Sequence, residues 1–126
     1  MTRIYVSSSS PYEARYGFSR GVRHGTRIEI AGTAPVPAEG DELAASPYHQ
    51  MMRCGEIALE ALDELGGAPE HIIRTVMYIT DPSYGDDVGR AHKEMFGEAA
   101  PAATMVMVAG LLDPDWKVEI EVSAQL

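Results

Sequence analysis

Alternating polar and apolar residues in the first third of the chain predict short strands of a sheet that has one buried face. Arg27-Ile28-Glu29-Ile30-Ala31 alternates most regularly, and residues 3–6 and 18–23 also suit strands. His24-Gly25-Thr26 separates the last two of these segments, and its glycine favours a tight turn. We therefore expect three strands, the last two joined as a hairpin, before the proline- and glycine-rich loop at residues 35–40.

The middle of the chain changes to the spacing of three and four residues that marks an amphipathic helix. Ser46 is a favourable N-cap residue, and Pro47 is tolerated at the first helical position. Gly66-Gly67 predicts a left-handed end to this helix. A second helix is expected from Asp81-Pro82. The apolar positions of the two helices are Met51, Cys54, Ala58, Ala61, Leu62 and Leu65, and then Tyr84, Val88, Ala91 and Met95.

Three further apolar segments complete the predicted fold. Residues 72–80, 104–108 and 118–122 have the residue types that favour strands. The element order β-β-β-α-β-α-β-β indicates an α+β protein: a single domain over residues 1–126, with a mixed six-stranded sheet and two helices on one face. The other face would have no cover, so we expect an interface there, with apolar contacts from Met105 and Met107.

Composition and charge narrow the class of protein. The chain has 126 residues, 45% hydrophobic and 23% charged, which is typical of one globular domain. Its net charge of −9 comes from 10 basic and 19 acidic residues without a basic cluster, so we expect no nucleic acid partner. A lone cysteine, Cys54, excludes an internal disulfide, and no apolar run predicts a signal peptide or a membrane span. These features predict a cytoplasmic protein that does not contact a membrane.

Two chemical patterns are weak. Gly17-Phe18-Ser19-Arg20-Gly21 has the Gly-x-Ser-x-Gly form of a hydrolase nucleophile elbow, but polar residues precede it where that motif needs a buried strand. The four histidines and Cys54 lack the spacing of a metal site, and no phosphate-binding glycine loop with a lysine is found. The sequence predicts neither a metal ion nor an organic cofactor.

Several segments, in order along the chain, resemble the RidA family, also called YjgF or L-PSP. The closing segments Pro101-Ala-Ala-Thr-Met-Val-Met-Val108 and Lys117-Val-Glu-Ile-Glu-Val122 are similar to the family's Pro-Ala-Arg-Ser and Ile-Glu-Ile-Glu strands. Gly17-Phe18-Ser19-Arg20-Gly21-Val22, Ile30-Ala31-Gly32-Thr33-Ala34-Pro35 and Val76-Met-Tyr-Ile-Thr-Asp81 are similar to family patterns as well. The resemblance implies a chorismate-mutase-like fold and a homotrimer with three clefts between subunits. In family enzymes these clefts hydrolyse imines and enamines.

The resemblance also implies which residues line the cleft, and several depart from the family. Ala103 stands where family enzymes carry the arginine that grips a substrate carboxylate with two hydrogen bonds. Phe18 keeps the ring of a tyrosine without its hydroxyl, while Gly89 and Met105 replace an asparagine and a cysteine. Glu119 remains, as the expected catalytic residue that positions water. The expected ligand-binding residues are Phe18, Ser19, Arg20, Ala31, Gly32, Thr33, Gly89, Ala103, Thr104 and Met105.

Three hypotheses about function follow. The first is a homotrimer that binds a small apolar or uncharged molecule between subunits and hydrolyses or tautomerises an imine, enamine or carbonyl compound. The second is a general deaminase of the 2-iminobutanoate/2-aminoacrylate type, in which Arg20 replaces the lost anchor. The third is a non-catalytic trimer that binds a ligand or a protein. Two simpler interpretations stay open: Arg20 as a solvated strand residue, and Glu119 as an outward-facing strand carboxylate.

Overall fold

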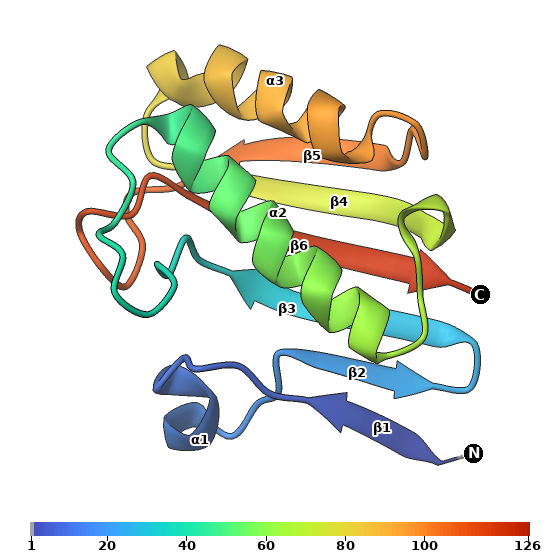
Figure 1. The fold of residues 1–126 in the computed structure, drawn as a ribbon. Helices are drawn as coiled ribbons and strands as arrows, with labels where there is room; N and C mark the ends of the chain where they lie inside the picture. The colour runs from blue at the N-terminus through green and yellow to red at the C-terminus, as the bar shows by residue number, and fades with distance from the viewer. Residues whose placement is uncertain (1) are drawn as a thin grey trace.

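The computed structural model describes residues 2–126, in which two long helices lie across one face of a six-stranded sheet (Figure 1). The strands are β1 (Arg3–Val6), β2 (Gly21–His24), β3 (Arg27–Thr33), β4 (Ile72–Ile79), β5 (Ala102–Met107) and β6 (Val118–Gln125). The helices are α1 (Tyr12–Tyr16), α2 (Pro47–Glu64) and α3 (Gly85–Phe96), with single 3-10 turns η1 (Pro69–His71) and η2 (Pro82–Tyr84). The predicted α+β class, mixed sheet and pair of covering helices are confirmed.

The strand order in the sheet is β1-β2-β3-β6-β4-β5. Neighbouring strands are antiparallel except for β4 and β5, which are parallel. Parallel strands need a crossover connection, and α3 supplies it between β4 and β5. The order places β1 and β5 at opposite edges of the sheet (Figure 1). Residues on β3 and β5 are therefore separated by two whole strands.

Helix α2 begins and ends where the sequence predicts. The Ser46 hydroxyl accepts a hydrogen bond of 3.0 Å from the backbone amide of His49, as an N-cap does. At the other end, Gly66 has a φ angle of +87°, a left-handed conformation that glycine adopts without steric cost. The Gly67 amide then donates to the Leu62 carbonyl at 2.9 Å. These caps fix the length of the helix that crosses β3 and β6 (Figure 1).

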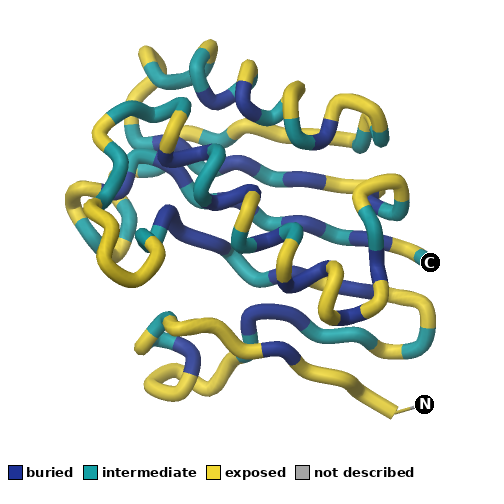
Figure 2. The backbone as a smooth tube through the Cα atoms, in the orientation of Figure 1, coloured by how far each residue is buried: buried dark blue, intermediate teal, exposed yellow. Residues whose placement is uncertain are grey.

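The core lies between the helices and the sheet, and the residues that face away from it are more exposed (Figure 2). Along β6, Val118, Ile120 and Val122 are buried, while Glu119 and Glu121 alternate with them on the uncovered side of the sheet. The helices cover the sheet with buried apolar residues that include Met51, Cys54, Ala58, Leu62, Val88, Ala91 and Phe96. No helix among residues 2–126 has the length and apolar character that crossing a membrane requires.

The predicted strand at residues 18–23 is wrong at its start. Tyr12–Tyr16 form the short helix α1, which Gly17 ends with a φ angle of +78°, and β2 begins only at Gly21. The intervening residues form the connection from α1 to the sheet. Figure 1 shows α1 beside the end of β1.

The expected position of two methionines is also wrong. Met105 and Met107 pair in register with Met77 and Ile79, which are buried in the core. Because residues paired across neighbouring strands share a face, both methionines lie on the helix side of β5 rather than on the uncovered side. They remain partly exposed because β5 is an edge strand, with 37% of Met105 and 48% of Met107 accessible.

Candidate functional site

Gly32 and Glu119 lie next to each other where β3 ends and β6 begins. The register between these strands shifts between Ile30 and Thr33, as it does at a β-bulge. A Cβ atom at Gly32 would lie 3.5 Å from Oε2 of Glu119. The glycine therefore leaves one side of the Glu119 carboxylate uncovered, and only a residue without a side chain does so.

The environment of Glu119 favours its neutral form. The residue is half-buried, and burial raises the pKa of its carboxyl above the ordinary value of 4.5. The charge of Arg20 opposes this rise, whereas the carboxylate of Glu121 adds to it. A carboxylate whose pKa is raised accepts a proton more readily near neutral pH, which is what a general base requires.

Arg20 is buried, and its charge is paired within the chain. Only 4% of the residue is exposed, so the interpretation as a solvated strand residue is wrong. Its Nε lies 3.3 Å from Oε2 of Glu13 on α1. Its Nη1 donates to the Gly32 carbonyl at 2.6 Å and to the Thr33 hydroxyl at 3.0 Å. The guanidinium therefore holds the end of β3 in place, with the Phe18 ring 5.6 Å away.

Glu13 holds Arg20 at this site, and the sequence analysis missed it. It is 5% exposed, and it accepts hydrogen bonds from both the backbone amide and the hydroxyl of Ser8 as well as pairing with Arg20. The segment before α1 and the segment after it are thereby joined by one carboxylate. The sequence signal for α1 was Pro11, which favours a helix start, followed by Gly17, which favours a helix end. The residues between them are too few to show helical periodicity.

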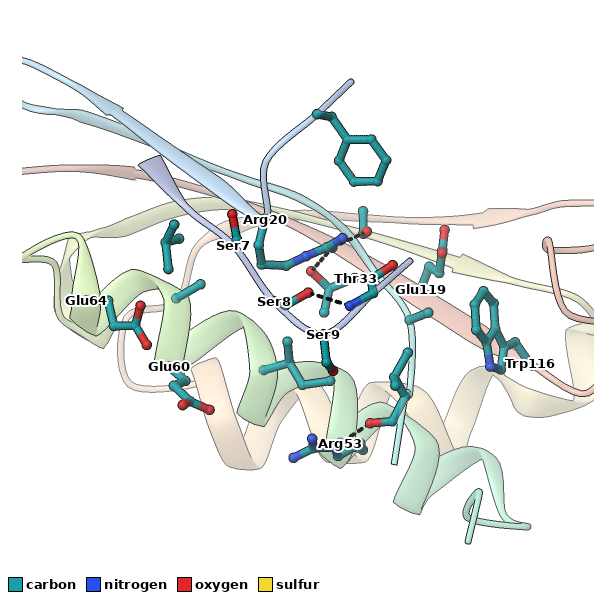
Figure 3. A pocket seen from close by; sticks show the side chains of 18 residues that line it. Ser7, Ser8, Ser9, Arg20, Thr33, Arg53, Glu60, Glu64, Trp116 and Glu119 are labelled. Atoms are coloured by element: carbon teal, nitrogen blue, oxygen red, sulfur yellow. Dashed lines mark hydrogen bonds between the residues drawn. The ribbon is translucent and has the colours of Figure 1, made fainter. Parts of the chain in front are cut away.

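A pocket of about 230 Å³ opens beside Arg20 and Glu119 (Figure 3). One wall is the serine segment at residues 7–10, and the opposite wall is the outer side of α2. In Figure 3, Ser8 and Ser9 lie between the Arg20 side chain and the helix that carries Glu60 and Arg53, with Trp116 and Glu119 at one end. Its lining is Val6, Ser7, Ser8, Ser9, Ser10, Phe18, Arg20, Gly32, Thr33, Ala34, Val36, Arg53, Ile57, Glu60, Ala61, Glu64, Trp116 and Glu119.

A second, shallower hollow lies on the uncovered side of the sheet. It shares Phe18 and Gly32 with the pocket beside Arg20, so the two are neighbours across the end of β3. Ser19 and Ala31, both expected at the site, line this second hollow. Nearby on the same side of the sheet, the Tyr78 hydroxyl donates to Glu121 at 2.5 Å, which raises the pKa of the tyrosine.

The remaining expected residues form a separate group at the β5 edge. Ala103 and Thr104 are exposed, and Thr104 accepts a hydrogen bond of 3.2 Å from Arg74. Met105 lies beneath α3, its Cε 4.0 Å from where a Cβ atom of Gly89 would be. The strand order separates β5 from β6, which carries Glu119, by two steps of about 4.8 Å, or roughly 10 Å, and from β3 by a third step. One chain therefore does not bring this group to Glu119.

No set of three or more histidine, cysteine, aspartate or glutamate side chains within residues 2–126 has the geometry to hold a metal ion. Cys54 is fully buried, and burial raises the pKa of its thiol well above the ordinary value. A thiol in that environment stays protonated and unreactive. The chemistry that the described residues support is that of a carboxylate, a buried guanidinium and backbone groups.

Sequence comparison assigns the chain to a protein family. The sequence model of the family described as Endoribonuclease L-PSP matches residues 8–126. The protein SCO2049 of Streptomyces coelicolor is 39% identical over 121 residues, which cover 94% of this chain and 89% of that protein. A RutC family protein of Pyrococcus abyssi is 27% identical over 108 residues, which cover 85% of this chain and 84% of that one.

Solved structures agree with this assignment. A member of the YjgF/YER057c/UK114 family from Mycobacterium tuberculosis, Rv2704, superposes with a TM-score of 0.91 at 33% identity, over 99% of this chain and 100% of that one. The crystal structure of E. coli TdcF with bound serine superposes with a TM-score of 0.79 at 25% identity, over 97% and 93% of the two chains. The chain therefore belongs to the L-PSP family, also known as the YjgF or RidA family.

Proposed function

We propose that this protein is a homotrimer that binds a small, uncharged molecule in clefts between its subunits and hydrolyses or tautomerises an imine, enamine or carbonyl group there. The observation that carries the proposal is the half-buried Glu119 carboxylate beside Gly32, with its pKa raised by burial. A carboxylate in this setting suits the activation of water. Its position beside a pocket supplies the room for a substrate.

The arrangement of the two groups of site residues supports a cleft shared between subunits. One group lies at the end of β3 and the start of β6, and the other lies on β5 at the far edge of the sheet. A trimer in which the β5 edge of one subunit meets the β3 end of its neighbour would complete each cleft. The exposed residues of the β5 edge, Ala103 and Thr104, would then lie nearest to Glu119 of the adjoining chain, with Met105 and Gly89 behind them.

The proposed hydrolysis needs one base and one water molecule. The Glu119 carboxylate accepts a proton from water while the water oxygen bonds to the imine carbon, and the electron pair of the C=N bond moves to nitrogen. The Glu119 carboxyl returns this proton to nitrogen, which gives a carbinolamine. It then transfers the carbinolamine hydroxyl proton to the same nitrogen as the C–N bond breaks and the C=O bond forms, and ammonia and a carbonyl compound leave. The Gly32 backbone borders the reacting atoms, and its carbonyl is held by Arg20 at 2.6 Å.

The substitution of arginine by Ala103 supports an uncharged substrate. A methyl group cannot replace the paired, charge-assisted hydrogen bonds that arginine makes with a carboxylate. Loss of such a partner costs about 1.5–3 kcal/mol, or roughly ten- to a hundredfold in affinity. The cleft would therefore discriminate little in favour of amino-acid-derived imines.

The test is keto-acid release from 2-aminoacrylate and 2-iminobutanoate that a dehydratase generates in place. Native protein would be compared with Glu119→Gln, Ala103→Arg and an arginine-bearing family member. We expect little activity from the native chain and a gain of at least about tenfold from Ala103→Arg, because the carboxylate clamp returns. Native activity equal to that of the arginine-bearing protein would contradict the proposal.

A second candidate, the general deaminase with Arg20 as anchor, also has an observation in its favour. Arg20 lines the pocket that contains Glu119, and a family relative, TdcF, has been crystallised with serine, an amino acid with a carboxylate. However, Nε and Nη1 of Arg20 already bind Glu13, Gly32 and Thr33, which leaves Nη2 for a ligand. A requirement for a free substrate carboxylate, measured by comparing an imino acid with its amide, would favour this candidate over the first.

A third candidate is a trimer that binds a ligand or protein without catalysis, and unchanged activity of Glu119→Gln would favour it. The family's name mentions an endoribonuclease, but the net charge of −9 makes RNA an unfavourable partner, so we propose no nucleic acid binding. We further propose that the protein works in the cytoplasm without a cofactor. Its single cysteine suits a reducing compartment.

A further inference from the structure

We propose that the pocket between the serine segment (residues 7–10) and α2, here called the serine pocket, is a subsite for a neutral, flat molecule that carries a carbonyl oxygen. The reaction at Glu119 rests on the proposed function, whereas binding in this subsite does not. The family resemblance places ligand groups at Phe18, Arg20, Gly32, Thr33 and Glu119, and the serine pocket extends from these residues to α2. Figure 3 shows Ser8 and Ser9 between Arg20 and the helix that carries Arg53, Glu60 and Glu64.

Arg20 provides the donor. Its Nη2 makes no hydrogen bond within residues 2–126, although Nε and Nη1 make three. No buried side-chain nitrogen or oxygen of these residues lacks a partner, so Nη2 has access to the pocket that Arg20 lines. A charged donor on a side chain that is only 5% exposed favours an acceptor oxygen, because a charge-assisted hydrogen bond is stronger than a neutral one.

The surrounding charges indicate that the ligand carrying this acceptor oxygen is neutral. Glu13 already compensates the charge of Arg20 at 3.3 Å. The other charged lining residues are Arg53 and three glutamates, Glu60, Glu64 and Glu119. Arg53 in turn lies 3.3 Å from Glu56, outside the pocket lining. An anion would therefore enter a region with an excess of negative charge, and a cation would offer Arg20 no acceptor.

The apolar part of the lining favours a flat ring or a short, unsaturated chain. Phe18, Trp116 and Ile57, the last of them on α2, are among the residues that line the pocket. The Trp116 ring is held edge-on to the Tyr12 ring of α1, with the centroids 6.3 Å apart. At about 230 Å³ the space is smaller than the roughly 300–1,000 Å³ of sites for drug-sized ligands, which limits the occupant to a small metabolite.

Three probes of one shape and different charge test this inference: benzamide, benzoate and benzamidine. Binding is measured by NMR from the Arg20 Nε–H signal and from the indole N–H signal of Trp116, the only tryptophan of the chain. We expect benzamide to shift both signals and to bind at least about tenfold more tightly than either charged probe. Glu60→Gln combined with Glu64→Gln should narrow the gap between benzoate and benzamide.

Two plugging variants and a matched control locate the site. Ile57→Trp and Ser9→Trp fill the pocket from opposite walls and should each weaken benzamide binding at least about tenfold. Asp63→Trp adds the same side chain at an exposed position of α2 outside the lining and should leave the affinity unchanged. Thermal melting shows which variants are folded. One folded variant of Ile57→Trp and Ser9→Trp is enough for the test.

The possible outcomes separate this inference from the proposed function. Benzamide binding that both plugs weaken, in a protein whose Glu119→Gln variant still binds benzamide, supports the serine pocket whether or not the native chain hydrolyses imines. Benzoate or benzamidine binding as tightly as benzamide would overturn the assignment of ligand class. No shift with benzamide, or equal binding by the folded plug variants, would overturn the subsite itself, even if Glu119-dependent turnover is found.

Discussion

Glu13 and Arg20 form a buried ion pair, with Oε2 and Nε 3.3 Å apart and only 6% and 5% of their side chains exposed. The pair joins α1 to the residue just before β2, and through Nη1 of Arg20 it reaches the carbonyl of Gly32. The position of the pocket wall and the position of the β3 end therefore depend on one carboxylate. Three predictions test parts of this arrangement, and a fourth tests the trimer.

Glu13→Ala should lower the free energy of unfolding by about 3–5 kcal/mol, because it leaves the Arg20 charge buried and uncompensated. The measurement is urea denaturation followed by circular dichroism. The matched control is Glu29→Ala, which removes a carboxylate from the exposed pair with Arg27, where the side chains are 49% and 56% exposed. That loss should be about 0–1 kcal/mol. Equal losses in the two variants would show that the buried pair contributes no more to the free energy of unfolding than the exposed pair does.

Glu119→Gln should change how stability depends on pH. Since the folded pKa of Glu119 is raised above 4.5, the native state binds more protons than the unfolded state in the range just above that value. Native stability is therefore reduced as pH rises through this range, and the neutral glutamine removes the reduction. We expect the variant to be the more stable protein at pH 7 and the two to converge below about pH 4. Parallel unfolding curves at several pH values provide the measurement, and a constant difference would contradict the raised pKa.

Gly32→Ala should separate folding from function. The added Cβ atom would lie 3.5 Å from Oε2 of Glu119, which is an ordinary contact distance, so the stability should change by less than about 1 kcal/mol. The methyl group would cover the open side of the carboxylate and should reduce turnover at least about tenfold, because the attacking water loses its place. Gly110→Ala is the control, since a Cβ atom there meets nothing within 4 Å. Unchanged turnover in Gly32→Ala would remove Gly32 from the site.

Local sequence patterns were sufficient for α2 and β6. The cap at Ser46, the glycine end at Gly66 and the strand at residues 118–122 are each determined by neighbouring residues, and the structure confirms all three. Helix α1 was not predictable in this way, because its five residues complete little more than one turn and are held by a contact between Glu13 and Arg20.

The side of the sheet that a residue faces was harder to predict from sequence. Placing Met105 needs the knowledge that β5 pairs in parallel with β4, which depends on the whole topology rather than on β5 itself. The burial of Arg20 depends likewise on a carboxylate seven residues earlier in the chain. The family resemblance named the site residues, but the strand order shows that one chain holds them as two separate groups.

That separation leads to the last prediction, which is complementation between two inactive variants. Ala103→Trp should block the β5 half of a cleft, and Glu119→Gln should remove its base, so each homotrimer should be inactive towards a substrate that the native protein turns over. In trimers refolded from an equal mixture, a cleft is intact when its Glu119 comes from the first variant and its β5 edge from the second. Random assembly gives this pairing in about a quarter of clefts, so roughly a quarter of native activity should return. If each chain instead held a complete site, mixing would restore none.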